Sequence, residues 1–194
     1  MSVTNDIERV LVSKEEISGR ISELANEISQ DYADADSLLL VSILRGAFIF
    51  TADLARNLTV KHSVDFIALA SYQKSTSSGE VRMISDLRQS IEGRHVLIVE
   101  DIVDSGNTIE KITQMMVQAG VNKYRIASLF YKPEAYTKEY KIHYVGLEIP
   151  NDFIVGYGLD YNGLGRNLNA IYKLKTTKMT NLVLFGPPGA GKGT

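Results

Sequence analysis

The fold is decided by residues 96–108, which read Val96-Leu97-Ile98-Val99-Glu100-Asp101-Ile102-Val103-Asp104-Ser105-Gly106-Asn107-Thr108. Residues 96–99 are apolar without a break, which is typical of a strand buried on both faces. We expect this strand to stop at the two carboxylates, Glu100 and Asp101, and a helix to run from Thr108 to a glycine stop at Gly120. Ligands of open α/β sheets bind just beyond the carboxyl ends of strands, so these carboxylates are candidate binding residues.

The rest of the chain repeats this alternation of strand and helix. Ser13 and Glu16 form a capping box before an amphipathic helix predicted over Lys14 to Tyr32, and a second helix is predicted from Phe48 to about Leu58. Further strand patterns lie at residues 38–44, 64–70, 125–131 and 144–149. This order predicts an α/β fold with a mostly parallel central sheet flanked by helices. Residues 73–79 are Ser- and Thr-rich and predict a mobile loop.

Composition narrows the class of protein. The 21 Lys and Arg residues nearly balance the 23 Asp and Glu residues, without the basic excess of a non-specific nucleic-acid binder. The chain has no cysteine, which excludes disulfide scaffolds, Cys-ligated metals and thiol catalysis. Because of this charge balance, we expect no nucleic-acid partner. We also expect no membrane partner, because the most apolar stretch, residues 38–50, is broken by Ser42 and Arg45 and is too short to span a bilayer. No secretory signal is visible at the N-terminus, so a cytoplasmic protein is predicted.

The segment from Asp104 to Thr108 has the composition of an anion site. Small, hydroxylated and glycine residues at a helix N-terminus expose backbone N–H groups, and the helix dipole favours negative charge there. A phosphate at this segment with a polyol at Glu100 and Asp101 describes a site for a ribose 5-phosphate. The alternative is that Asp104 or Ser105 only caps the helix and that the carboxylates are solvated. The whole string favours the functional interpretation.

Residues 99–108 resemble the phosphoribosyl-pyrophosphate motif of type I phosphoribosyltransferases, and the similarity to the bacterial hypoxanthine-guanine branch runs from about Val10 to Leu174. The resemblance implies that family's fold, with a small hood over the carboxyl ends of the strands. It also implies purine salvage: Mg²⁺-dependent transfer of the 5-phosphoribosyl group from phosphoribosyl pyrophosphate to hypoxanthine or guanine. The products would be IMP or GMP and pyrophosphate. A homodimer or homotetramer is expected.

The resemblance also assigns the residues that bind phosphoribosyl pyrophosphate. Glu100 and Asp101 would hold the ribose hydroxyls, and residues 104–108 would cradle the 5-phosphate. The pyrophosphate loop would be Leu44-Arg45-Gly46, where the family often has a cis peptide bond before the basic residue; the alternative is a plain strand-to-helix turn. The remaining residues assigned to this substrate are Ser71 and Tyr72, which open the expected lid, together with Arg166. A disordered polar loop fits residues 71–79 equally well.

A second group of residues is assigned to the purine base. Lys132 would donate to the purine O6, Phe153 would stack on the base, and Ile102, Ile154 and Asp160 would complete the base pocket. Without the resemblance, Lys132 is a solvated lysine, Phe153 is a core residue and Asp160 and Arg166 are surface charges. The metal ligands would be Glu100, Asp101 and Asp160.

The chemistry explains these residue types. Loss of pyrophosphate builds positive charge on the ribose and negative charge on the leaving group, which Mg²⁺, Arg45 and Arg166 would stabilise. Asp104 is the predicted catalytic residue, a general base that takes the proton from N7 of the purine as N9 attacks. A lysine donor selects a 6-oxo over a 6-amino purine, because two donors facing each other leave a buried ammonium unpaired.

Two other functions remain open. The same fold can act as a regulator that senses phosphoribosyl pyrophosphate, but such regulators usually carry a nucleic-acid-binding element or a basic face, and neither is visible. The third hypothesis is a P-loop kinase, because residues 179–194 resemble the start of an adenylate kinase, with the phosphate loop at 186–194. We therefore divide the chain into a phosphoribosyltransferase domain, residues 1–175, and a linker with a truncated P-loop start, residues 176–194, without kinase activity. The tail suggests a fused parent protein.

Overall fold

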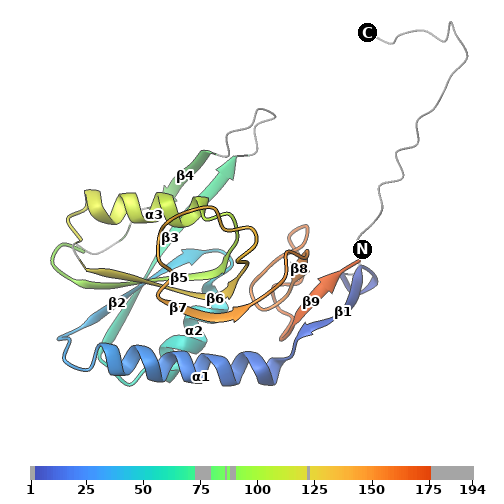
Figure 1. Cartoon of the computed structure of the whole chain (residues 1–194), viewed down its shortest axis with the longest axis horizontal. Helices are drawn as coiled ribbons and strands as arrows, with labels where there is room; N and C mark the ends of the chain where they lie inside the picture. The colour runs from blue at the N-terminus through green and yellow to red at the C-terminus, as the bar shows by residue number, and fades with distance from the viewer. Residues whose placement is uncertain (1–2, 73–79, 86, 88–90, 122, 176–194) are drawn as a thin grey trace, which may run out of the picture.

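The computed structural model describes residues 3–72, 80–85, 87, 91–121 and 123–175. A six-stranded sheet of order β4-β3-β2-β5-β6-β7 forms its centre (Figure 1). Its strands are β2 (Leu38–Leu44), β3 (His62–Tyr72), β4 (Glu80–Ser85), β5 (His95–Val103), β6 (Tyr124–Tyr131) and β7 (Tyr144–Glu148). All neighbours pair in parallel except β3 and β4, which pair antiparallel at the sheet edge. The predicted α/β fold with a mostly parallel sheet is confirmed.

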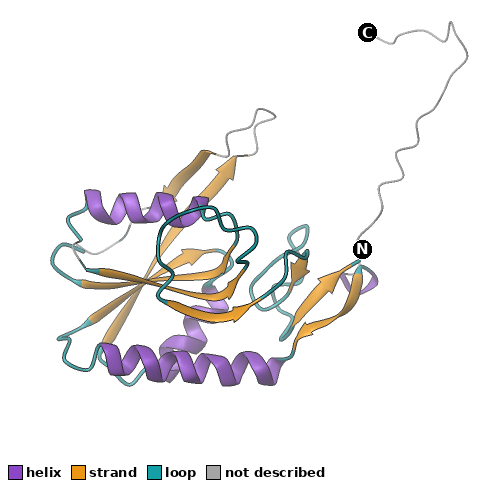
Figure 2. Ribbon diagram, in the orientation of Figure 1, coloured by secondary structure: helices purple, strands orange, loops and turns teal. Residues whose placement is uncertain are grey.

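Helices cover both faces of this sheet. On one face lie α1 (Lys14–Asp31) and α2 (Phe48–Asn57), and on the other lies α3 (Asn107–Gln118), as Figure 2 shows. The predicted cap of α1 is present, because the Ser13 hydroxyl accepts a 3.2 Å hydrogen bond from the Glu16 N–H. The predicted bounds of all three helices agree with the observed ones to within one residue at each end.

The strand β2 shows why its sequence is apolar without a break. Leu38 and Leu40 belong to the core under α1 and α2, whereas Leu39 and Val41 belong to the core under α3. Ser42 interrupts the apolar run without cost, because its buried hydroxyl accepts a 2.7 Å hydrogen bond from the buried Thr51 hydroxyl of α2. The strand is therefore buried on both faces, as predicted.

A second, three-stranded antiparallel sheet forms the expected hood. Its order is β1-β9-β8, from β1 (Ile7–Val12), β9 (Ile171–Leu174) and β8 (Ile154–Val155), and the 3₁₀ turn η1 (Val3–Asn5) precedes it. It lies beyond the carboxyl ends of the main strands (Figure 1). The hydrophobic pattern did not indicate its strands, because β1 is mostly exposed and the other two are very short.

The predicted end of β5 was wrong. The strand does not stop at Glu100 but continues to Val103, because β6 pairs with it as far as Ile102↔Phe130 and Val103↔Tyr131. On its other side, β2 pairs with β5 only up to Ser42↔Val99. The two carboxylates therefore lie inside a strand, at the point where one of its two neighbours departs.

Two expectations concern residues that the structure does not describe: the loop at 73–79 and the phosphate-loop tail at 176–194. Within the described part of the chain, no helix combines the length and the apolar character needed to cross a membrane.

Candidate active site

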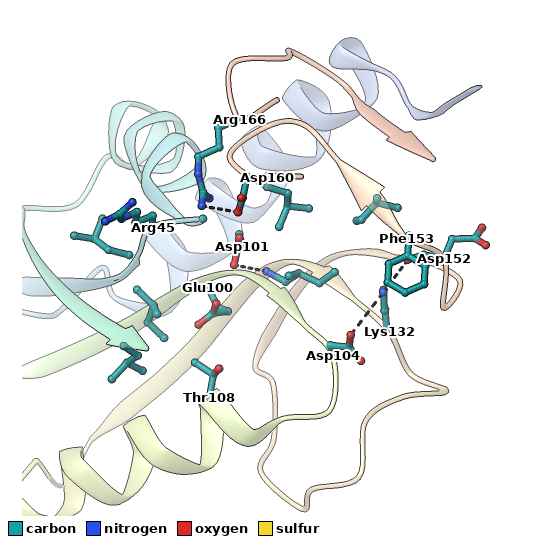
Figure 3. Close-up of a pocket in the computed structure, with 17 residues that line it drawn as sticks. Arg45, Glu100, Asp101, Asp104, Thr108, Lys132, Asp152, Phe153, Asp160 and Arg166 are labelled. Carbon is teal, nitrogen blue, oxygen red and sulfur yellow. Dashed lines mark hydrogen bonds and ion pairs between the residues drawn. The ribbon is translucent and has the colours of Figure 1, made fainter. Parts of the chain in front are cut away.

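A cavity of about 410 Å³ opens where β2 and β5 diverge (Figure 3). The chain runs from β2 to β3 on one side of this point and later continues into β6 on the other, so the cavity lies at the topological switch point of the sheet. Most of the predicted site residues line it: Leu44, Arg45, Gly46, Glu100, Asp101, Ile102, Asp104, Thr108, Lys132, Phe153, Ile154, Asp160 and Arg166.

The acidic pair forms the floor of the cavity. Glu100 and Asp101 are each only 7% exposed, and the Glu100 Oε2 atom is buried without a hydrogen-bond partner among the described residues. Burial raises the pKa of both carboxyl groups, and the neighbouring Asp101 charge raises that of Glu100 further. Arg166 acts in the opposite direction on the pKa of Asp101. Asp101 accepts a 2.9 Å hydrogen bond from the Ile102 N–H, so the unpartnered oxygen belongs to Glu100. A buried carboxylate oxygen without a partner, next to a second buried carboxyl group, is typical of a site that binds a cation or a hydroxyl donor.

The loop after β2 passes directly over this pair. The Leu44–Arg45 peptide bond is cis, as the resemblance implied. At Gly46 the backbone comes so close to Asp101 that a Cβ atom would meet the carboxylate, which is why only glycine fits. The backbone of residues 44–46 and the acidic pair are therefore in contact and line the cavity together.

The start of α3 provides the second wall of the site. The N-cap residue of α3 is Gly106, with a φ of 88°, and no side-chain hydrogen bond caps the helix. The alternative in which Asp104 or Ser105 only caps the helix is therefore wrong. A Cβ on Gly106 would lie 2.5 Å from the ring of Tyr136, so the turn is closed on its outer side. Asp104 and Thr108 face the cavity; Ser105 and Gly106 lie in the bend between β5 and α3, and Asn107 is the first residue of the helix. The first N–H groups of a helix without a side-chain cap attract an anion.

Lys132 and Phe153 define the far end of the cavity. Lys132 is only 7% exposed, and its ammonium donates a 2.9 Å hydrogen bond to the carbonyl of Asp152 and lies 3.7 Å from Oδ2 of Asp104 (Figure 3). Phe153, in contrast, is 80% exposed. The alternatives of a solvated lysine and a core phenylalanine are both wrong. A buried cation beside an exposed ring is the reverse of ordinary packing and indicates a ligand pocket.

Asp160 and Arg166 face the cavity from the loop between β8 and β9. Their side chains form an ion pair of 2.5 Å, and the other carboxylate oxygen of Asp160 accepts a 2.9 Å hydrogen bond from the Gly163 N–H. Arg166 also donates to the Gly158 carbonyl at 2.6 Å. Among the described residues, no group of three or more His, Asp and Glu side chains is placed to hold a metal ion. In this structure the Asp160 carboxylate is engaged with Arg166 and the Gly163 N–H.

Sequence reasoning missed some residues of the cavity: Ile43, Leu69, Asp152 and Leu159. Asp152 contributes its main-chain carbonyl, for which a sequence carries no signal. Ser105, Gly106 and Asn107 do not line the cavity, and Ser71 and Tyr72 end β3 with side chains outside the described part of the chain.

The fold, the acidic pair at the switch point and the uncapped helix start together define a phosphoribosyltransferase, and the chain belongs to that family. The family model described as phosphoribosyl transferase domain matches residues 11–162. Among the relatives, a hypoxanthine-guanine phosphoribosyltransferase of Mycobacterium tuberculosis is 44% identical over 172 residues, which is 86% of this chain and 85% of that protein. The Bacillus subtilis protein of the same name is 42% identical, over 88% of this chain and 95% of the relative.

Solved structures agree with this assignment. A crystal structure of a hypoxanthine phosphoribosyltransferase from Staphylococcus aureus superimposes with a TM-score of 0.84 at 41% sequence identity. The match covers 90% of this chain and 95% of that chain.

Proposed function

We propose that this chain transfers the 5-phosphoribosyl group from phosphoribosyl pyrophosphate to hypoxanthine or guanine, and so acts in purine salvage as a pentosyltransferase. One observation carries the proposal: a single cavity joins the buried acidic pair, the start of α3 and the buried Lys132 beside the exposed Phe153. The start of α3 corresponds to the 5-phosphate, the acidic pair to the ribose, and Lys132 with Phe153 to the base. Relatives at 42–44% identity that carry this name support it.

At the sugar end, Glu100 and Asp101 accept hydrogen bonds from the ribose hydroxyls, which supply the donor that the buried Oε2 atom of Glu100 lacks. Residues Asp104 to Thr108 cradle the 5-phosphate through backbone N–H groups and hydroxyls at the α3 N-terminus. Arg45, Gly46 and Arg166 bind the pyrophosphate, with Leu44 at the cis bond. Ser71 and Tyr72 are assigned to the lid over this end.

The donors at the sugar end fit a Mg²⁺ ion that arrives with the substrate. Mg²⁺ is commonly bound by one or two carboxylates plus phosphate oxygens and water, and Glu100 and Asp101 are two adjacent carboxylates, one with an unpartnered oxygen. Asp160, the third assigned ligand, would reach the ion only by giving up part of its pairing with Arg166. When bound, the ion neutralises charge that develops on pyrophosphate.

At the base end, Phe153 stacks on the purine, Ile102 and Ile154 contact its faces and edge, and Asp160 closes the pocket. The Lys132 ammonium, fixed by the Asp152 carbonyl, donates to the purine O6. A 6-amino group would face this donor with another donor, so the ammonium N–H that points at the base would be left without an acceptor. Adenine is therefore a poor substrate.

The reaction follows from this arrangement. The purine N9 forms a bond to the anomeric carbon while the bond from that carbon to the pyrophosphate oxygen breaks, and its electron pair leaves with pyrophosphate. The proton on N7 passes to the Asp104 carboxylate, which is half exposed toward the cavity and held near Lys132. Arg45, Arg166 and backbone N–H groups stabilise the leaving charge.

The proposal extends to the organisation of the chain. Residues 1–175 form the phosphoribosyltransferase domain, and residues 176–194, which include the phosphate-loop pattern at 186–194, are a separate segment that takes no part in the transfer. We place the protein in the cytoplasm. We expect a homodimer or homotetramer, and light scattering would test this oligomeric state. Deletion of the residues after Lys175 would leave transferase kinetics unchanged under this division.

A steady-state assay with hypoxanthine, guanine, xanthine and adenine, with and without a metal chelator, tests the function. We expect phosphoribosyl-pyrophosphate-dependent turnover of hypoxanthine or guanine that far exceeds that of adenine and stops with the chelator. A regulator on the same fold, the alternative, would bind phosphoribosyl pyrophosphate in a calorimeter and turn over none of the four bases. That outcome would overturn the enzymatic assignment.

A further inference from the structure

The β8–β9 loop is in direct backbone contact with the loop after β2. At Gly158 a Cβ atom would lie 2.1 Å from the carbonyl oxygen of Gly46, so the two main chains touch. Gly158 also exchanges hydrogen bonds with Arg166: its N–H donates to the Arg166 carbonyl at 2.9 Å, and its carbonyl accepts from the guanidinium at 2.6 Å. Gly158 therefore connects Arg45-Gly46, on one side of the proposed pyrophosphate site, with Arg166 on the other.

The residue before this contact, Tyr157, has an unusual backbone. Its φ is 46°, in the left-handed region that large side chains rarely adopt. Such a conformation persists only where the surroundings hold it. Here the side chain is 7% exposed and belongs to the core under α1 and α2, and the Tyr157 N–H donates to the Leu168 carbonyl at 2.8 Å.

The Tyr157 hydroxyl is held by an acid on α2. It donates a hydrogen bond to Oδ2 of Asp53, whose other oxygen pairs with the exposed Arg56. Burial and the Asp53 carboxylate both raise the pKa of Tyr157, so its hydroxyl remains a donor at every physiological pH. Asp53 sits on the helix that begins directly after Arg45-Gly46-Ala47. The start of α2 thus follows the Arg45-Gly46 loop, and Asp53 in the middle of α2 binds Tyr157, which precedes Gly158.

These contacts close a ring: residues 45–47 lead into α2, Asp53 on α2 binds Tyr157, Tyr157 leads into Gly158, and Gly158 touches Gly46. We propose that Asp53 and Tyr157 are a positioning pair that sets the separation between the Arg45-Gly46 loop and Arg166, and hence the affinity for the pyrophosphate group. This inference rests on the proposed function, because it assigns phosphoribosyl pyrophosphate as the substrate. Neither residue touches the reacting atoms.

The structure supplies a matched control at the opposite end of the sheet. Tyr144, at the start of β7, is also a buried tyrosine whose hydroxyl donates to an aspartate, Asp31, at 2.8 Å. Tyr144→Phe therefore removes the same kind of tyrosine–aspartate hydrogen bond as Tyr157→Phe, together with a hydrogen bond that the Tyr144 hydroxyl accepts from Arg125. A change that follows only from lost stability would appear in both variants, whereas a positioning effect would appear in one.

The experiment compares KM for phosphoribosyl pyrophosphate and for hypoxanthine, together with the thermal midpoint. We expect Tyr157→Phe and Asp53→Ala each to raise KM for phosphoribosyl pyrophosphate about tenfold, the scale of one hydrogen bond to a charged acceptor. KM for hypoxanthine at saturating co-substrate should change less than about twofold, since the base end contacts neither residue. Asp53→Asn, which keeps an acceptor oxygen, should restore most of the affinity, and the double variant should be no worse than either single one.

Tyr144→Phe should lower the thermal midpoint but leave both KM values at the wild-type level. The proposal is overturned if Tyr157→Phe leaves KM for phosphoribosyl pyrophosphate unchanged, or if both KM values rise together in Tyr157→Phe and Tyr144→Phe. Calorimetric Kd values for Mg²⁺-phosphoribosyl pyrophosphate provide the same comparison without turnover. If the wild-type chain binds this compound but turns over no base, the proposed function is rejected. The Kd values of the variants would still decide whether Asp53 and Tyr157 are a positioning pair.

Discussion

A Cβ atom on Gly46 would lie 1.5 Å from Oδ2 of Asp101 and 2.4 Å from its Cγ. The backbone of the loop after β2 thus lies directly against this carboxylate, whose side chain is largely buried at the floor of the cavity. The close approach couples the proposed pyrophosphate loop to the proposed ribose-binding pair. Any side chain at position 46 must displace one or the other.

Gly46→Ala should therefore reduce kcat/KM for phosphoribosyl pyrophosphate by about a hundredfold or more, the cost of a displaced positioning group. Gly19→Ala is the matched control, because a Cβ at Gly19, in α1, would meet nothing within 4 Å. That change should preserve kinetics and slightly raise the thermal midpoint. Wild-type kinetics in Gly46→Ala would show that the contact does not matter for the site.

Asp104→Asn should lower kcat about a hundredfold, the scale of a lost general base. The Kd for phosphoribosyl pyrophosphate, measured by calorimetry, should stay close to wild type, because the 5-phosphate is held mainly by backbone N–H groups at the start of α3. If the variant turned over at the wild-type rate, Asp104 would have no part in the proton transfer.

Lys132→Gln tests the selection of the base. Glutamine can present an acceptor to a 6-amino group, so the ratio of kcat/KM for hypoxanthine over adenine should fall by at least about tenfold. The control is Lys175→Gln, which removes an exposed lysine that donates to the Asn5 carbonyl outside the cavity. An unchanged ratio in Lys132→Gln would rule out Lys132 as the selecting donor.

Glu100→Gln should stabilise the unliganded protein while it weakens catalysis. The pKa of Glu100 is raised above 4.5 by burial and by Asp101, so the folded state holds this proton more tightly than the unfolded state. Wild-type stability therefore falls as pH rises from 4.5 through the folded-state pKa, and the glutamine variant escapes this loss. Calorimetric scans between pH 4.5 and 8 should show a higher midpoint for the variant at pH 8 and a shrinking gap at lower pH.

The exposed Glu27→Gln change on α1 provides the control and should show no such gap. A Glu100→Gln variant that is less stable than wild type at pH 8, with a gap that widens on acidification, would contradict the assigned direction of the pKa shift.

The elements with a strong hydrophobic pattern could be predicted from sequence. The bounds of β2 and α1 follow from an unbroken apolar run and from a cap at Ser13, which are local signals. The strand β5 was placed correctly at its start, but its end depends on pairing with β6, which no local pattern reveals. The hood strands β8 and β9 are formed by partners far apart in the sequence and carry too few residues for a pattern.

The same distinction holds for the site. Residues 100–108 are contiguous and chemically distinctive, so their role could be inferred from the chain alone. The Asp152 carbonyl that fixes Lys132 and the left-handed backbone of Tyr157 could not, because one is a main-chain atom and the other is imposed by packing against α2. Burial also reversed two local expectations, since Lys132 is enclosed and Phe153 is exposed.

The most direct test of the central assignment is a crystal structure of the protein with IMP bound. The account predicts the 5-phosphate at the N-terminus of α3, the ribose hydroxyls within hydrogen-bonding distance of Glu100 and Asp101, and the purine O6 about 3 Å from the Lys132 Nζ atom with the ring against Phe153. A nucleotide bound in the reverse direction, or outside this cavity, would contradict it.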